Sequence, residues 1–222
     1  DHAEKIIITD TVFSMDGDLA PLEDIVRLGR EHGALLVVDE AHATGIFGRG
    51  RGLAAEMDLT SEVDVHMGTF SKALGSHGGY IAGKKDLIRL ITTTGRAFIY
   101  STALPPAVIG ANLAAVEHVL AHPEEGEKLL QTSREMAGFL REQGFASGSG
   151  DSQIIPVIIG ANRETLDASG FLREKGLFVP AIRPPTVPEN TARLRLSLRA
   201  DMTDSNLDML KNAFLQLGKG RG

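Results

Sequence analysis

The 222-residue sequence contains no cysteine. This absence excludes a disulfide framework, a thiolate metal site and a cysteine nucleophile. The sequence also lacks an apolar run long enough to span a membrane and a basic-then-apolar leader, so we expect a cytoplasmic protein that does not bind membranes. Its formal net charge of −6 argues against nucleic acid as a partner.

Three kinds of catalytic or metal motif are missing as well. The run Asp39-Glu-Ala-His42 spells the acidic motif of helicase-type ATPases, but the nearest match to a phosphate loop begins at Gly78, after that motif, and has Lys85 where a hydroxyl should bind magnesium. Ser14 lacks a Gly-x-Ser-x-Gly elbow, which disfavours a serine hydrolase. The seven histidines show no metal-ligand spacing, so no metal site is predicted.

The first half of the sequence alternates short apolar strands with amphipathic helices. Pro21 opens a helix that Gly33 ends, and a long helix follows Pro105. This alternation predicts a mostly parallel sheet covered by helices. Strands are predicted at residues 6–9, 34–38, 63–67, 79–82 and 97–100, and further helical segments at residues 85–92 and after residue 105.

The pattern changes after His122. Helices alternate there with an apolar strand at residues 154–159 and with the strict alternation Arg193-Leu-Arg-Leu-Ser-Leu-Arg199, which predicts a small α+β domain with one sheet face exposed. We therefore predict a partial large domain at residues 1–104, a connecting helix at 105–122 and a small carboxyl-terminal domain at 123–222.

One lysine, one carboxylate and one imidazole stand where strand-to-helix loops could converge. Pyridoxal phosphate (PLP) needs an amine, an anion for its ring nitrogen, and donors for its oxygens. Lys72 lies among small and hydroxylated residues, Asp39 ends an apolar strand, and His42 follows in the same loop. A lone lysine in a glycine-rich loop is usually a surface residue, and an aspartate after a strand is usually a helix cap. Their occurrence in this order favours a PLP site.

Five blocks, taken in order, resemble the α-oxoamine synthases, a family of fold-type I PLP enzymes. The blocks run over most of the chain: Phe13-Ser-Met-Asp-Gly-Asp18, Asp39-Glu-Ala-His-Ala-Thr-Gly45, Gly68-Thr-Phe-Ser-Lys-Ala-Leu-Gly75, Phe98-Ile-Tyr-Ser-Thr-Ala-Leu-Pro-Pro106 and Ile182-Arg-Pro-Pro-Thr-Val-Pro188. The resemblance implies an α/β fold of the PLP-dependent transferase type, with a mostly parallel sheet in a partial large domain and a small α+β domain.

The resemblance also assigns residues. Lys72 matches the lysine that holds PLP as a Schiff base, Asp39 the acid paired with the ring nitrogen, and His42 a residue near the phenolate oxygen; these three are the predicted catalytic residues. The other predicted cofactor contacts are Ser14, Thr69 and Thr102, the last reaching the phosphate across a dimer interface. The predicted substrate-binding residues are Arg183, whose guanidinium suits a carboxylate, and Thr186.

The function that the resemblance implies is a decarboxylative C-acyl transfer. An amino acid, L-alanine, condenses with an acyl thioester, pimeloyl-CoA or a pimeloyl carrier protein, to give 8-amino-7-oxononanoate for biotin biosynthesis, in a homodimer. Alternatives are a glycine-using relative of the 2-amino-3-ketobutyrate ligase type, a fold-type I aminotransferase, or a truncated, catalytically silent dimerisation module. Because the glycine-rich turn and the ring-stacking histidine of the family's amino-terminal half are absent, we expect this chain to be part of a longer enzyme.

Overall fold

The computed structural model describes residues 4–219, and the chain divides into two compact units. Unit 1 takes in residues 1–12 and 19–127, and unit 2 takes in residues 13–18 and 128–222. A short segment near the amino terminus therefore belongs to the unit that is otherwise built from the carboxyl-terminal half. The domain boundaries at 104 and 122 stay a prediction.

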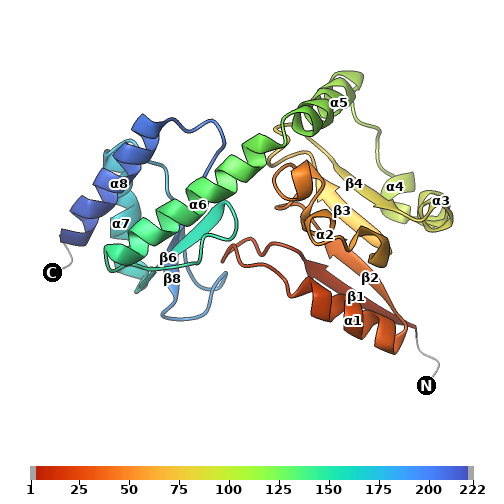
Figure 1. Ribbon diagram of the computed structural model, residues 1–222, viewed down its shortest axis with the longest axis horizontal. Coiled ribbons are helices and arrows are strands. Elements are labelled where there is room, and N and C mark those ends of the chain that lie inside the picture. The colour runs from red at the N-terminus through yellow and green to blue at the C-terminus, as the bar shows by residue number, and fades with distance from the viewer. Residues whose placement is uncertain (1–3, 220–222) are drawn as a thin grey trace. The chain divides into compact units, whose positions relative to one another are not determined.

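Unit 1 is a four-stranded sheet with helices, in which the strands follow the order β1-β2-β3-β4 (Figure 1). β1 pairs with β2 and β2 with β3 in parallel, whereas β3 and β4 are antiparallel. The predicted mostly parallel sheet is confirmed. The elements are β1 (Lys5–Asp10), α1 (Leu22–His32), β2 (Ala34–Asp39), η1 (Gly48–Gly50), α2 (Leu53–Glu56), η2 (Thr60–Glu62), β3 (Val65–Thr69), β4 (Gly79–Gly83), α3 (Lys85–Thr94), α4 (Arg96–Ile99), α5 (Pro106–Ala121) and the start of α6 (Glu124–Glu142).

Helix α1 begins and ends where the sequence predicts. Pro21 precedes it, and Gly33 ends it in the left-handed conformation at φ 60°, which glycine adopts without a steric penalty. Acidic residues occupy its first turn and basic residues its last, as the helix dipole favours. Strand β2 therefore begins at Ala34, directly after the glycine that ends α1.

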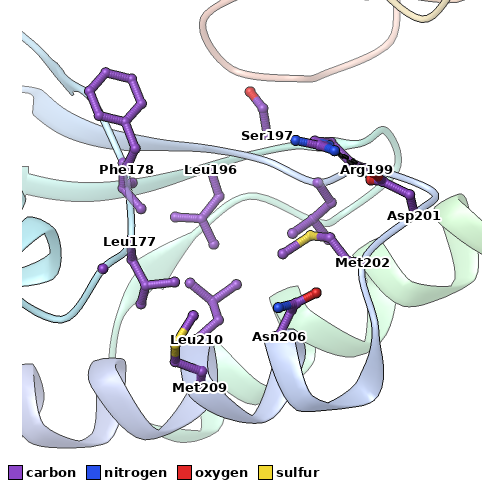
Figure 2. A pocket seen from close by; sticks show the side chains of 13 residues that line it. Leu177, Phe178, Leu196, Ser197, Arg199, Asp201, Met202, Asn206, Met209 and Leu210 are labelled. Atoms are coloured by element: carbon purple, nitrogen blue, oxygen red, sulfur yellow. Dashed lines mark hydrogen bonds and ion pairs between the residues drawn. The ribbon is translucent and has the colours of Figure 1, made fainter.

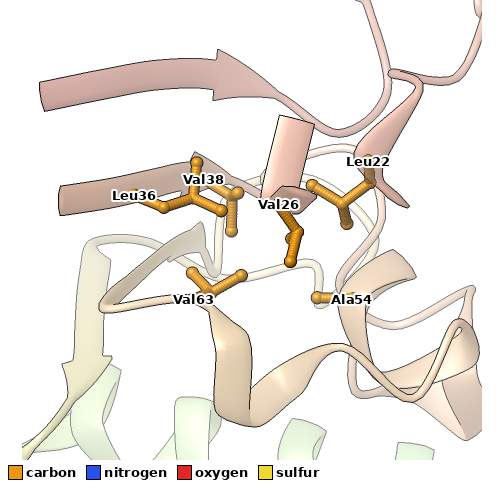
Figure 3. Close-up of a cluster of buried hydrophobic side chains, with 6 residues drawn as sticks. All are labelled: Leu22, Val26, Leu36, Val38, Ala54 and Val63. Carbon is orange, nitrogen blue, oxygen red and sulfur yellow. The ribbon is translucent and has the colours of Figure 1, made fainter. Parts of the chain in front are cut away.

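The core of unit 1 lies between α1, α2 and one face of β2 (Figure 3). Leu22 and Val38 are fully buried there. Burying each such side chain contributes about 1.5–3 kcal/mol of stability. This burial stabilises the packing of α1 against β2. The cluster consists of Leu22, Val26, Leu36, Val38, Ala54 and Val63.

The segment from Arg96 to Ala121 forms two helices, α4 and α5. The predicted strand at 97–100 is wrong: residues 96–99 form α4, and the chain turns at the next residue. Phe98 and Tyr100 are 65% and 78% exposed, so no sheet neighbour draws this aromatic run into a strand. Helix α5 carries an exposed apolar stripe, which consists of Ile109, Leu113, Val116 and Leu120.

Unit 2 is an antiparallel sheet of order β5-β6-β8-β7 with helices, as the small α+β prediction requires. Its core includes the fully buried Ile155, Leu194 and Phe214, and the ring of Phe214 meets that of Phe145 edge to face at 5.4 Å. Its elements are the rest of α6, β5 (Ala146–Ser147), β6 (Ile154–Gly160), α7 (Asn162–Glu174), β7 (Ala181–Ile182), β8 (Ala192–Ser197) and α8 (Asp204–Lys219).

The alternating strand β8 departs from the expected pattern at one position. The leucines at 194, 196 and 198 are buried as predicted, but Arg193, on the face expected to be solvated, is only 6% exposed. Its guanidinium pairs with Asp16, from the amino-terminal segment of the same unit. A buried guanidinium requires such a partner, which the local alternation cannot reveal.

Candidate functional site

Three strand ends of unit 1 meet at one edge of its sheet. Asp10, the last residue of β1, is the register partner of Asp39, the last residue of β2. Asp39 in turn partners Met67 of β3, two residues before Thr69. Since β1, β2 and β3 are parallel, the loop that carries Lys72 leaves the sheet at the same edge, where open α/β sheets bind ligands.

The carboxylate of Asp39 is oriented by its own loop. Its Oδ1 accepts a hydrogen bond from the Ala41 backbone N–H at 2.8 Å. The Asp39 carbonyl accepts one from the Thr11 N–H at 2.9 Å and another from the Thr11 hydroxyl at 3.2 Å. These bonds fix the residue on both sides, so a cation would meet a carboxylate that is already positioned.

The loop of His42 touches the loop of Lys72. Gly45 has φ 86°, and a Cβ placed on it would lie 3.0 Å from the Cβ of Ala73. Glycine at this position lets the two loops approach closely. His42, which is partly buried, and Lys72, which is exposed, thus belong to neighbouring loops of one unit.

The lysine loop is closed by the hydroxyl of Thr69, which donates to the Gly78 carbonyl at 2.9 Å and meets the Ser71 hydroxyl at 2.8 Å. The Gly75 N–H donates to the Lys72 carbonyl at 3.0 Å. Thr69 therefore shapes the loop, and Ser71 adds a second hydroxyl that the sequence prediction did not include. The Lys72 residue itself is exposed.

A third ionisable group, Asp10, lies at this edge of the sheet. Burial raises the pKa of the Asp10 carboxyl above its ordinary value, the Asp39 carboxylate raises it further, and the Lys72 ammonium opposes both. Asp39 and Lys72 are therefore both within electrostatic reach of Asp10. Sequence reasoning missed Asp10, although the signal was the same as for Asp39: a carboxylate directly after an apolar strand.

Thr102 lies away from regular structure, between α4 and α5, and is exposed. Its predicted contact across a dimer interface stays a prediction.

Ser14 lies in unit 2, in the tight turn formed by residues 13–18. The Ser14 carbonyl accepts a hydrogen bond from the Arg195 Nε at 2.5 Å, and the Gly17 carbonyl accepts one from the buried Ser152 hydroxyl at 2.7 Å. With the pair of Arg193 and Asp16, this makes three ties between the turn and the sheet of unit 2. Arg193 and Arg195, two of the three alternating arginines, hold this turn, whereas Arg199 is exposed and pairs with Asp201.

The two predicted substrate-binding residues lie in a second turn of unit 2. The Thr186 N–H donates to the Arg183 carbonyl at 3.0 Å, and both residues are exposed. The turn follows β7 and precedes β8, so it is anchored at both ends. The Arg183 side chain is thus presented to solvent from a short, closed turn.

A cavity of unit 2 lies away from both turns. A cavity of about 340 Å³ opens between α8 and the strand end at residues 196–199, lined by Leu177, Leu196, Met202, Asn206 and Leu210, among others (Figure 2). A second cavity of about 330 Å³ lies in unit 1 beside Phe70, Leu74 and Tyr80. Neither is lined by a predicted site residue, because the predicted residues stand on open loops.

Residues 4–219 contain neither a cluster of metal ligands nor a membrane-spanning helix. In that range, no three histidine or acidic side chains gather as metal ligands would. No helix in the same range has the length and apolar character needed to cross a membrane.

The donor set at the edge of the unit 1 sheet fits pyridoxal phosphate. It offers an amine at Lys72, an oriented anion at Asp39, an imidazole at His42 and hydroxyl groups at Thr69 and Ser71. These are the groups that an aldehyde, a pyridinium nitrogen, a phenolate and a phosphate require.

Comparison with known proteins points the same way. A family model described as aminotransferase class I and II matches residues 1–214. The chain is 46% identical over 220 residues to a putative 8-amino-7-oxononanoate synthase of Geobacillus kaustophilus, covering 98% of this chain and 56% of the relative. It is 44% identical over 222 residues to the 8-amino-7-oxononanoate synthase of Pelobacter propionicus, with the same coverage.

A solved structure is similar over nearly the whole chain. Serine palmitoyltransferase of Sphingomonas wittichii superposes with a TM-score of 0.95 at 32% identity, covering 99% of this chain and 56% of that one. The predicted resemblance to α-oxoamine synthases and the predicted fold class are confirmed. The chain spans about half the length of the curated relatives it matches.

Proposed function

We propose a pyridoxal-phosphate-dependent activity for the whole protein, since this chain belongs to the aminotransferase class I and II family, whose model matches nearly all of it. The reaction is a decarboxylative condensation of an amino acid with an acyl thioester. The substrates are L-alanine and a pimeloyl thioester, and the product is 8-amino-7-oxononanoate for biotin synthesis. The relatives' names support this choice, and a solved serine palmitoyltransferase, whose structure contains PLP, supports the cofactor.

One observation carries the proposal: neighbouring parallel strands of unit 1 end at Asp39 and at the loop of Lys72. An amine and an oriented carboxylate at one sheet edge suit the two ends of a single small heterocycle. The electrostatic reach of both groups to Asp10 agrees with this closeness.

Each residue then has a task. When bound, PLP withdraws electrons from the α-carbon of an amino acid. Lys72 binds the cofactor and, once freed by substrate, moves a proton at the α-carbon; Asp39 keeps the cofactor's ring nitrogen protonated. His42 donates to the phenolate oxygen, and Thr69, Ser14 and Thr102 contact the cofactor.

Arg183 and Thr186 are proposed to bind a substrate. Arg183 presents a fork of N–H donors that suits a carboxylate, and Thr186 adds a hydroxyl from the same turn. The protein is proposed to act as a homodimer in the cytoplasm.

The test is an assay of the whole protein with L-alanine and a series of acyl thioesters of different chain length, on coenzyme A and on carrier protein. Release of carbon dioxide together with an amino ketone is the expected result. Formation of a keto acid from alanine, with no carbon dioxide, would instead establish a transaminase.

A second candidate is a catalytically silent module that dimerises. The exposed stripe of α5, with Leu113 60% exposed, favours this candidate. Purified chain that forms dimers but shows no new visible absorbance after addition of PLP would support it over the enzyme.

A further inference from the structure

A buried acid follows Asp39 directly and is bonded from two sides. Glu40 is 3% exposed. Its Oε1 accepts a hydrogen bond from the Ala54 backbone N–H at 2.8 Å, at the start of α2, and its Oε2 lies 3.4 Å from Nδ1 of His66 on β3. Its carbonyl accepts from the N–H groups of Ala43 at 2.9 Å and Thr44 at 2.8 Å. Both the side chain and the main chain of Glu40 therefore shape the loop at residues 39–44.

The ring of His66 faces an acceptor at each nitrogen. Nδ1 faces the Glu40 carboxylate, and Nε2 lies 3.1 Å from the Thr60 carbonyl, which can only accept. A neutral imidazole has one N–H and one bare nitrogen, so it can satisfy only one of these partners. The imidazolium form donates to both. Its bond to Glu40 is partly buried, since the His66 side chain is 14% exposed and that of Glu40 3%, whereas its bond to Thr60 is exposed.

The charge balance agrees with this assignment. The hydrogen bond to Glu40 raises the pKa of His66 above its ordinary value, and burial opposes that rise. Tyr80 of β4 is a further titratable group that interacts with Glu40. Burial raises the pKa of the Tyr80 phenol, so this group stays neutral. Its oxygen lies 2.9 Å from the Thr44 hydroxyl, with which it shares a hydrogen bond.

The backbone at Gly52 packs directly against the Glu40 carboxylate. A Cβ on Gly52, at φ 113°, would lie 2.3 Å from one carboxylate oxygen. Glycine at this position therefore leaves the room that the Glu40 carboxylate occupies.

We propose that Glu40 and protonated His66 are positioning residues: their buried charge pair holds the loop at residues 39–44, and with it Asp39 and His42, in the shape that the cofactor site needs. The part of this inference that concerns the cofactor rests on the proposed function. Neither residue is assigned a contact with the cofactor; both act through the loop.

The decisive variant is Glu40→Gln. The glutamine carbonyl keeps the bond to the Ala54 N–H, and its amide donates to a bare Nδ1 while Nε2–H serves Thr60. Every hydrogen bond survives with a neutral His66, so the variant removes charge and little else. Glu31→Gln, on the exposed face of α1, is the matched control.

The first measurement is the NMR titration of the His66 ring nitrogens without cofactor. We expect a His66 pKa above about 6.5 in the wild type and below it in Glu40→Gln, with Glu31→Gln unchanged. An ordinary pKa in the wild type, or one that Glu40→Gln leaves unchanged, would overturn the charge pair.

The second measurement is amide hydrogen exchange of Ala43 and Thr44 at pH 6. We expect exchange about tenfold faster in Glu40→Gln, the size of a lost charge-assisted contribution. Relative to the intrinsic base-catalysed exchange rate, the wild type should lose the same protection as the pH rises through the His66 pKa, because the stabilisation from a raised pKa is present below about pH 6.5 and lost above the folded-state value. Exchange in Glu40→Gln equal to that in the control would overturn the positioning role.

The third measurement is titration of the whole protein with PLP, read by visible absorbance. We expect the cofactor dissociation constant to rise about tenfold in Glu40→Gln and to stay unchanged in Glu31→Gln. An unchanged constant would overturn the cofactor part of the inference. If the wild type binds no PLP while the first two measurements give the expected results, the proposed function fails and the charge pair stands.

Discussion

The two units hold their predicted site residues in different ways. In unit 1, Asp39 and Lys72 follow strands whose ends are fixed by parallel pairing and by a buried core. In unit 2, Ser14 and Arg183 stand on turns, the first tied by side chains from distant strands and the second closed by its own backbone bond. The residues proposed for catalysis thus lie at or shortly after strand ends, whereas a proposed cofactor contact, Ser14, and a proposed substrate-binding residue, Arg183, lie on turns.

The strongest test of this contrast is Lys72→Ala. We expect it to abolish both the visible absorbance of bound PLP and turnover, because no other amine is proposed to bind the aldehyde. Lys85→Ala, an exposed lysine at the start of α3, is the control and should keep both. A wild-type spectrum in Lys72→Ala would refute the assignment of the site to unit 1.

The turn of Ser14 can be tested through a pair of glycines. Gly17 has φ 68°, and a Cβ there would lie 2.1 Å from the Ile154 carbonyl oxygen. Gly33 has a similar φ of 60°, but a Cβ on it would meet no atom within 4 Å. Alanine at 33 should cost about 1 kcal/mol of unfolding free energy and alanine at 17 about 2–3 kcal/mol more. Urea denaturation measures both. Equal costs would mean that the turn is not held against β6.

Arg183→Ala probes the turn expected to face substrate. We expect the KM of the carboxylate-bearing substrate to rise about tenfold, which corresponds to ~1.4 kcal/mol, with the cofactor spectrum unchanged. Steady-state kinetics on the whole protein give the result. A changed spectrum with an unchanged KM would move Arg183 from the substrate to the cofactor.

The smallest effect is expected for Asp10→Asn. The pKa of Asp10 is raised by burial and by Asp39, so its ionised form is disfavoured in the folded state and its stabilising contribution is lost as the pH rises from about 4 through the raised value. At pH 7 the neutral asparagine should raise the unfolding free energy of the chain without cofactor by less than about 1 kcal/mol, since the group is partly solvated. A loss of stability at pH 7 would show that the Asp10 charge is needed.

Sequence reasoning succeeded where the signal was local. The helix between Pro21 and Gly33 and the placement of Asp39 at the end of β2 depend on capping, periodicity and strand length, all readable within a dozen residues. The same reading failed at residues 97–100, where an aromatic run of high strand propensity has no sheet to join and forms α4.

The remaining misses involve partners that are distant in the sequence. Arg193 was read as a solvated residue because its bond to Asp16 joins residues 177 positions apart. Asp10 gained its importance only when the register brought it beside Asp39. Glu40 looked like part of the motif around Asp39, and its pairing with His66 depends on which strand lies next to β2. Contacts of this kind are set by topology, which composition and periodicity do not specify.

The hexapeptide at residues 13–18 has a consequence for dissection of the gene. Its base is closed by the bridge of Val12 with Leu19 in unit 1, while its tip is bonded to Ser152 and to β8 of unit 2. An expression fragment that starts at residue 128 would leave Arg193 buried without its carboxylate, so no single cut yields both halves intact. Separating the halves would require grafting this hexapeptide onto the carboxyl-terminal piece, and insertions or gene splits between residues 12 and 19 should be poorly tolerated.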